Sequence, residues 1–276
     1  MFWASNRKVQ AQVALLLWYV MSKAIRNTLS LLFRWDATIA LLSRQGCLLP
    51  YAYFEALLSL EDDRYWSFYD LIGCPRELVV PLVQLASLAE ENEKVLSMRW
   101  ARFDLSIIHE IQASILSWKN SSLEIDDALT EEQMHRQRDR WNCTEAWRYG
   151  LLIYITRVFL WNRSTGPASS RLAIYARLVL DHVNSCRRSS IVQKQAFFPL
   201  FLAGCELADE FSRQSIREYC RYWDGFSGYN LFNTASSFLE EIWAEQASSG
   251  TVWWGDVIDR KQALQSNGAP LQFCFG

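Results

Sequence analysis

Apolar residues recur every three or four positions along most of this chain, which is the spacing of one face of an α-helix. The two clearest stripes are Leu105, Ile108, Ile111 and Ile115, and then Trp147, Leu151, Tyr154, Ile155 and Val158. A β-sheet would need runs that alternate polar and apolar residues, and the chain has no sustained alternation of this kind. The pattern therefore predicts an all-α protein, a single large helical bundle of about nine to eleven helices.

Residues that begin and end helices divide these stripes into segments. Thr130 and Gln133 have the spacing of a capping box, which predicts the start of the longest helix, and Gly166-Pro167 should end it. Pro75 suits the first turn of another helix, where its missing N–H is not needed. Pro81 should kink that helix, or else the helix begins nearer Pro81.

The chain is long enough to bury one large core. It has 276 residues, half of them apolar, and its 13 tryptophans are costly to leave in water. No linker rich in Gly, Pro or Ser and no repeat of fixed length divides it. We expect one domain over residues 1–260 and a C-terminal tail over residues 261–276, with a short helical turn around Trp254–Asp259.

Charge and cysteine spacing exclude several classes of protein. The net charge is −2, from 28 basic and 30 acidic residues, whereas a nucleic-acid surface normally has a basic excess. The most basic run, His135–Arg140, is interpreted as a solvated helix face. The seven cysteines form no C-x-x-C pair, so neither a zinc ribbon nor a dithiol redox site is indicated. We expect buried free thiols in a reducing compartment.

The N-terminus has some features of a secretory signal, and the chain contains three glycosylation sequons. Arg7 and Lys8 precede the short apolar run Val13–Met21. The sequons are at Asn120, Asn142 and Asn162. The apolar pattern continues with helical spacing to Leu42, however, and Asn142 falls inside a predicted helix, so secretion is the weaker interpretation. No apolar run approaches the roughly 18–20 residues of a membrane span, and no membrane association is predicted.

Patterns that would carry chemistry are incomplete. His109-Glu110 begins like a zinc-protease helix, but Ala113 stands where the second histidine is required. Gly225–Tyr229 lacks the spacing of a nucleophile elbow and is interpreted as a turn. Asp62-Asp63 is the strongest candidate metal pair, although Arg64 follows where a full aspartate-rich motif needs another acid. We therefore assign no catalytic, cofactor-binding or metal-binding residue, expect no cofactor, and predict that the chain is not an enzyme.

Seven aromatic and aliphatic segments, in order along the chain, carry a family resemblance. They are Trp35–Arg44, Tyr53–Leu58, Trp66–Leu78, Glu145–Leu152, Phe198–Glu206, Ile216–Cys220 and Trp253–Asp259. Together they resemble the fungal-specific transcription factor domain, the helical regulatory region of fungal binuclear zinc-cluster transcription factors. The resemblance implies an all-α domain of a transcription regulator in the nucleus, and the family has no assigned catalytic residues to carry over.

One departure from the family bears on DNA binding. The cysteine-rich zinc cluster, which needs two C-x-x-C pairs in a basic segment, does not occur in this sequence, so we expect an N-terminally incomplete or cluster-less relative. Contact with DNA would then be indirect or through a missing N-terminal zinc cluster. Without further helices, one face of Trp18–Phe33 would be exposed and would favour association.

The resemblance also implies partners. We expect protein partners or a homo-oligomer, and the family admits a small-molecule effector. Tyr149, Trp147, Phe198 and Trp223 could line an effector cavity, although core packing is the simpler interpretation and they are not assigned as a site. The alternative function is a helical biosynthetic enzyme that acts on an apolar substrate and binds metal through Asp62 and Asp63.

Overall fold

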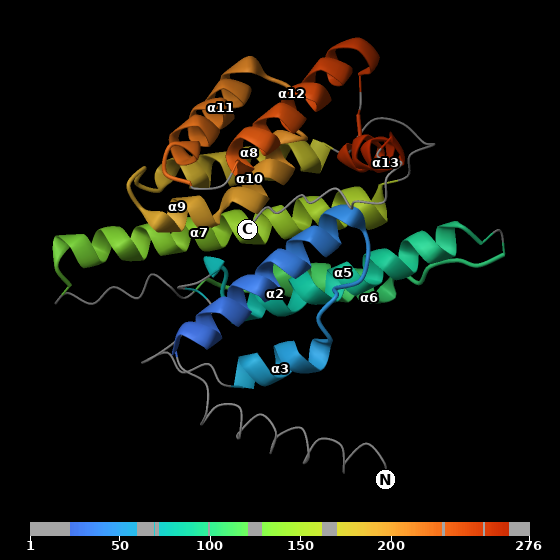
Figure 1. The fold of residues 1–276 in the computed structure, drawn as a ribbon, viewed down its shortest axis with the longest axis horizontal. Helices are drawn as coiled ribbons and strands as arrows, with labels where there is room; N and C mark the ends of the chain where they lie inside the picture. Colours follow the sequence, from blue (N-terminus) through green and yellow to red (C-terminus); the bar gives the residue numbers. More distant parts are fainter. Residues whose placement is uncertain are drawn as a thin grey trace, which may run out of the picture.

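The computed structural model describes residues 23–59, 69, 72–98, 100–120, 129–161, 170–227, 230–250 and 252–264, and every regular element in them is helical (Figure 1). The α-helices are α2 (Lys23–Ser43), α3 (Tyr51–Ser59), α5 (Arg76–Leu96), α6 (Ser106–Ser117), α7 (Glu131–Ile155), α8 (Ser170–Ser185), α9 (Ile191–Gln195), α10 (Phe197–Gly204), α11 (Glu210–Asp224), α12 (Leu231–Ser249) and α13 (Trp254–Leu264). A π-helix, η1 (Thr156–Leu160), continues α7. The predicted all-α bundle is confirmed.

The longest helix, α7, runs through the middle of the molecule. In Figure 1 it lies between α2, α3, α5 and α6 on one side and α8 to α13 on the other. From Asn142 to Ile155 every residue is buried except Arg148 and Tyr149, which are half-buried. A helix that is buried all round must be covered on every face, which explains why helices pack against α7 from both sides.

The start of α7 agrees with the sequence prediction, and its end does not. The backbone N–H of Gln133 donates to Oγ1 of Thr130 (3.4 Å), while the N–H of Thr130 donates to Oε1 of Gln133 (2.8 Å), so the capping box is present. The helical run ends in the π-turn at Leu160, before Gly166-Pro167, which lies outside the described residues. The π-turn widens the backbone at this point without any Gly or Pro, which is why the sequence did not reveal it.

The helix around Pro81 excludes one of the two alternatives that the sequence left open, a start nearer Pro81. Pro75 has extended backbone angles (φ −70°, ψ 157°) and serves as the N-cap, so α5 begins at Arg76 and continues through Pro81. Pro81 is itself buried, together with Leu78, Val79 and Leu82 on the same helix. The packing of this apolar segment offsets the hydrogen bond that proline cannot donate.

Glycines allow the aromatic segments to approach each other closely. A Cβ added to Gly150 of α7 would lie 2.9 Å from Cβ and 3.1 Å from Cα of Pro199 in α10. One turn earlier on α7, the ring of Trp147 stacks on Phe198 with centroids 5.8 Å apart. Gly73 has φ +73°, and its Cβ would meet Gln195 at 2.5 Å. At both glycines, segments that are far apart in the sequence thus come closer than any larger residue would allow.

The C-terminal helix closes the bundle against the N-terminal one. Trp254 is fully buried and stacks on Tyr154 of α7 (6.2 Å between centroids). Arg44, which follows α2 and has φ 54°, lies over Trp253 (4.8 Å) and forms ion pairs with Glu93 and Asp259. Helix α13 continues through Leu264, so it is longer than the short turn expected at Trp254–Asp259.

A second buried arginine joins the end of α7 to the same region. Arg157 and Glu206 are both almost fully buried and form a bidentate pair with N–O distances of 2.8 and 2.9 Å. The guanidinium of Arg157 lies 4.4 Å from the ring centroid of Trp161 and 3.5 Å from the carbonyl oxygen of Val252. The pair therefore ties η1 to α10 and to the segment before α13.

The two sequon asparagines that the structure describes, Asn120 and Asn142, use their side-chain amides in hydrogen bonds. The amide nitrogen of Asn142 donates to the carbonyl of Arg138 (3.0 Å), and that of Asn120 donates to Oε1 of Glu145 (3.1 Å). Asn162 lies outside the described residues. The side chain of Asn142 is buried, so its amide is not accessible to a glycan in this fold.

The cysteines that the structure describes are free; Cys74, Cys143, Cys186, Cys205 and Cys220 are buried and Cys47 is half-buried. The expected buried free thiols are confirmed there except for Cys47.

The close contact of Gly150 with Pro199 predicts a specific cost of adding one methyl group. Gly150→Ala should lower the free energy of unfolding by about 1–2 kcal/mol, because overpacking outweighs the better helix propensity of alanine. Gly225→Ala is the matched control, since its Cβ would meet its nearest atom at 3.5 Å. It should leave the free energy of unfolding unchanged or slightly higher. Urea denaturation of both variants tests this, and equal effects would contradict the proposed packing.

His182 predicts a loss of stability in mild acid. Its Nδ1 donates to Oδ1 of Asn142 (2.9 Å), and its ring stacks on Tyr149 (5.9 Å between centroids). Burial of the imidazole lowers the pKa of His182 below 6.5. The unfolded chain then binds more protons, and stability should fall as pH drops below about 6.5. The His182→Gln variant should not show this loss of stability in mild acid. The His109→Gln variant, in which the substituted residue is exposed on α6, should lose stability like the parent chain. Unfolding curves between pH 5 and 7.5 provide the measurement.

Candidate functional site

The four aromatic residues considered as an effector site are packed in the core. Trp147 and Phe198 stack on each other, and Tyr149 stacks on Tyr175 and on His182. The indole N–H of Trp223 donates to Oε1 of Gln193 (3.1 Å). None of the four lines either of the two larger cavities described below, so their geometry indicates packing and not ligand binding.

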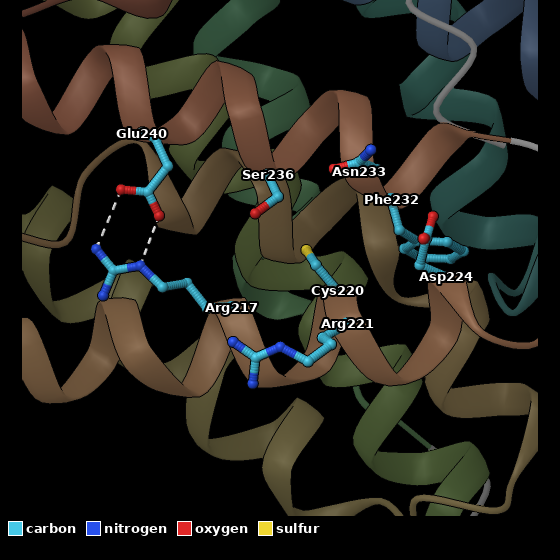
Figure 2. A pocket seen from close by; sticks show the side chains of 8 residues that line it. All are labelled: Arg217, Cys220, Arg221, Asp224, Phe232, Asn233, Ser236 and Glu240. Atoms are coloured by element: carbon cyan, nitrogen blue, oxygen red, sulfur yellow. Dashed lines mark hydrogen bonds and ion pairs between the residues drawn. The ribbon is translucent and has the colours of Figure 1, made fainter.

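One of these cavities, of about 280 Å³, lies between α11 and α12 (Figure 2). Arg217 reaches from α11 to Glu240 on α12, with N–O distances of 2.5 and 3.1 Å, and also donates to Glu210 (2.5 Å). Its guanidinium lies 4.9 Å from the ring centroid of Trp243. The pair of Arg217 with Glu240 holds the two helices together.

This groove does not contain an activated nucleophile. Cys220 lines it, but burial raises the pKa of Cys220 to about 12, so the sulfur stays a thiol at neutral pH. Ser236 and Asn233 also line the groove (Figure 2). We interpret the groove as a structural ionic contact.

The other cavity, of about 250 Å³, lies where α2 meets α9, α10 and the start of α12. We call it the α2–α9 cavity, and it is lined by Leu31, Arg34, Trp35, Ile191, Lys194, Gln195, Phe197, Ser227, Leu231 and Phe232. Most of these side chains are apolar, and the cationic groups come from α2 and from α9. An apolar cavity with a few polar groups is the usual form of a small-molecule site.

The polar groups of this cavity include two donors that lack acceptors in the described part of the chain. Nε of Arg34 and Nε1 of Trp35 are buried without a hydrogen-bond acceptor. Burial lowers the pKa of Arg34 to about 10, and the titratable groups that act against this are a thiol and a phenol, not a carboxylate. The ammonium of Lys194 lies 5.8 Å from the ring centroid of Phe232, and its pKa is lowered by burial and by Arg34.

The sequence did not identify this cavity. Arg34 and Trp35 adjoin Phe33 at the N-terminal end of the chain, whereas Lys194 follows Val192 far along it. A cation inside an apolar helical stripe is the one signal that could have drawn attention to Arg34. Only the packing of α9 against α2 brings Lys194 to the same place.

Other residues considered from the sequence are not brought together into a site. Asp62-Asp63 lies outside the described residues, and His109 is exposed on α6. In the described ranges, no cluster of three or more His, Cys, Asp or Glu side chains could hold a metal ion. Gly225 and Phe226 form a turn after α11, as expected.

The basic run on α7 is only partly solvated. Arg136 is exposed and pairs with Glu132, but Arg140 packs on the ring of Tyr69 (4.2 Å to the centroid). The expected solvated face therefore holds for Arg136 and not for Arg140. No helix among the described residues is both long enough and apolar enough to span a membrane.

The comparison with protein families decides what kind of chain this is. The family model described as the fungal specific transcription factor domain matches residues 13–266. The chain belongs to this family. No curated protein and no solved structure matched it. As a fungal-specific transcription factor domain, the chain has a transcription-regulatory role, in agreement with the resemblance carried by its aromatic segments.

Arg34, which has no carboxylate partner among the described residues, and Arg157, which is paired with Glu206, predict opposite effects of the same substitution on the free energy of unfolding. Arg34→Met should raise the free energy of unfolding by about 1 kcal/mol, because it removes a partly buried charge that no described carboxylate balances and keeps the apolar stem. Arg157→Met should lower it by about 3–5 kcal/mol, because Glu206 is then buried without its partner.

Denaturant unfolding measures both effects. Arg221→Gln, an exposed arginine of the α11–α12 groove, is the control and should change the free energy of unfolding by less than about 0.5 kcal/mol. Destabilisation by Arg34→Met as large as that by Arg157→Met would show that Arg34 has a stabilising partner, and would contradict the description of the α2–α9 cavity.

Proposed function

We propose that this domain is the regulatory and interaction region of a fungal zinc-cluster-type transcription factor and acts in the nucleus through protein partners or a second copy of itself. The family match over residues 13–266 is the observation that carries this proposal. We propose that the regulatory domain extends over residues 1–260 and is followed by a tail over residues 261–276, the first part of which continues α13 to Leu264. DNA contact would come from a zinc-cluster segment outside this sequence or from a partner protein.

The side-chain chemistry supports a role in which no covalent bond is made or broken. Burial holds the pKa of Cys74, Cys143 and Cys205 well above the usual range of a thiol, so none is a ready nucleophile. The buried carboxylate of Glu206 is used by Arg157, and the buried carboxylate of Asp139 accepts from Arg187 (2.7 Å). These charged groups are committed to holding helices together.

The packing also supports transmission of a signal between surfaces. Helices on both sides of α7 contact it, and α13 contacts α2 across the bundle. Side chains at such contacts interlock, so a small shift of one helix is passed to its neighbours as a change of packing. A small-molecule effector or a partner protein that favours one arrangement would change the surface available to the transcription machinery.

The direct test separates regulation from DNA binding. Residues 1–276 are fused to a heterologous DNA-binding domain and measured on a reporter with intermediate basal activity, so that activation and repression are both visible. The fusion should change reporter output by several-fold relative to the DNA-binding domain alone. Output equal to that of the DNA-binding domain alone would contradict a regulatory role.

A second experiment uses the purified chain without the fusion and measures its binding to DNA and zinc. Purified protein should not retard duplex DNA and should bind no stoichiometric zinc, because the sequence has no C-x-x-C pair. Tight, sequence-specific retardation by the purified chain would contradict the proposed division of labour.

A further inference from the structure

We propose that the α2–α9 cavity is a binding site for a small organic anion, a carboxylate carried on a compact apolar body. The inference rests on the proposed function only in so far as the bound molecule would be the effector of the domain. The binding step itself is a property of the cavity.

The two cations and the indole at the cavity favour an anion, whereas Gln195 and Ser227, which also line it, can either donate or accept a hydrogen bond. Arg34 and Lys194 are cations, and the indole of Trp35 can only donate a hydrogen bond. Nε of Arg34 and Nε1 of Trp35 have no acceptor among the described residues. A carboxylate supplies acceptor oxygens, and the planar guanidinium fork of arginine matches them in a bidentate arrangement.

The positive charges of Arg34 and Lys194 also repel each other. Arg34 and Lys194 approach closely enough that the guanidinium lowers the pKa of the ammonium, and burial acts in the same direction. The groups that raise the pKa of Arg34 against the effect of burial are a thiol and a phenol, so no carboxylate among the described residues balances this charge. A bound anion would balance it, whereas the paired arginines Arg44 and Arg157 already have carboxylate partners.

The rest of the lining restricts the body of the ligand. Leu31, Ile191, Phe197, Leu231 and Phe232 provide an apolar wall. The volume of about 250 Å³ exceeds the roughly 150 Å³ of an engineered protein cavity that binds benzene, so a one- or two-ring acid or a short-chain acid is the appropriate size. Inorganic phosphate would satisfy the cations and leave the apolar wall without a partner.

The position of the cavity gives the bound ligand a way to act. Arg34 and Trp35 belong to α2, on one side of α7, whereas Ile191 and Lys194 belong to α9, on the other side (Figure 1). A ligand that contacts both would stabilise the arrangement in which these helices are close. Its affinity for that arrangement would shift the population of the domain toward it.

Isothermal titration of the purified 276-residue chain tests the proposal with three probes. These are 2-naphthoate, its neutral analogue 2-naphthalenemethanol, and inorganic phosphate. Naphthoate should bind about tenfold or more tightly than the alcohol, because only the anion forms charge-assisted hydrogen bonds with Arg34. Phosphate should bind more weakly than naphthoate.

Variants then assign the binding to the cavity. Arg34→Met should remove the preference for naphthoate over the alcohol, and Arg34→Lys should retain part of it. Lys194→Met should weaken naphthoate binding several-fold. Arg221→Gln, which removes an exposed arginine outside the cavity, should bind naphthoate like the parent chain. Far-ultraviolet circular dichroism confirms that each variant is folded.

Three results would overturn the proposal. They are no binding of naphthoate, equal binding of naphthoate and the alcohol, and unchanged naphthoate affinity in folded Arg34→Met. Phosphate binding as tight as that of naphthoate would also overturn it, in favour of a phosphate site. None of these results bears on the reporter fusion, so failure of the site and failure of the regulatory role are separate outcomes.

Discussion

The second half of α7 is buried except for the half-buried Arg148 and Tyr149, and the arrangement of the other helices follows from this constraint. A helix without a solvent face cannot be stable until neighbours cover it. Helices α8 and α10 cover one side with the close contact of Gly150 and Pro199, while α5 and α6 pack on the other. Tyr154 is then covered by Trp254, which requires the C-terminal segment to return to the centre of the molecule.

The buried positive charges of this core belong to arginines that pair with carboxylates. Arg44 and Arg157 lie beside tryptophans, Arg44 over Trp253 and Arg157 over Trp161, and each has a carboxylate partner. In both cases the planar guanidinium stacks on an indole face while its N–H groups reach an acid, which is the combination that makes a buried arginine tolerable. Arg34 differs because no carboxylate accompanies it in the described residues, and this difference singles out the α2–α9 cavity.

Much of the fold could be predicted from local pattern. The helical spacing of Trp147, Leu151 and Tyr154 and the capping box at Thr130 depend on residues close in sequence, and both are correct. The end of α7 was wrong because η1 is a backbone adjustment that no residue type requires. The Asp62-Asp63 pair lies outside the described residues, and the prediction about it stays a prediction.

The candidate site could not be predicted, because it depends on distant segments. Arg34 and Lys194 share a cavity only after α9 has packed near α2, and nothing within either segment indicates the other. The aromatic segments gave the family correctly. Their tryptophans and glycines report contacts, however, and contacts in a core do not by themselves reveal what a cavity binds.

Hydrogen exchange of backbone amides, followed by mass spectrometry, tests the central claim that the C-terminal segment closes one cooperative core around α7. Peptides covering residues 143–155 and 254–264 should exchange at the same slow rate, because both are exposed only when the whole domain unfolds. Fast exchange of residues 254–264 while residues 143–155 remain protected would show that the core of α7 is complete without them, and would contradict this account.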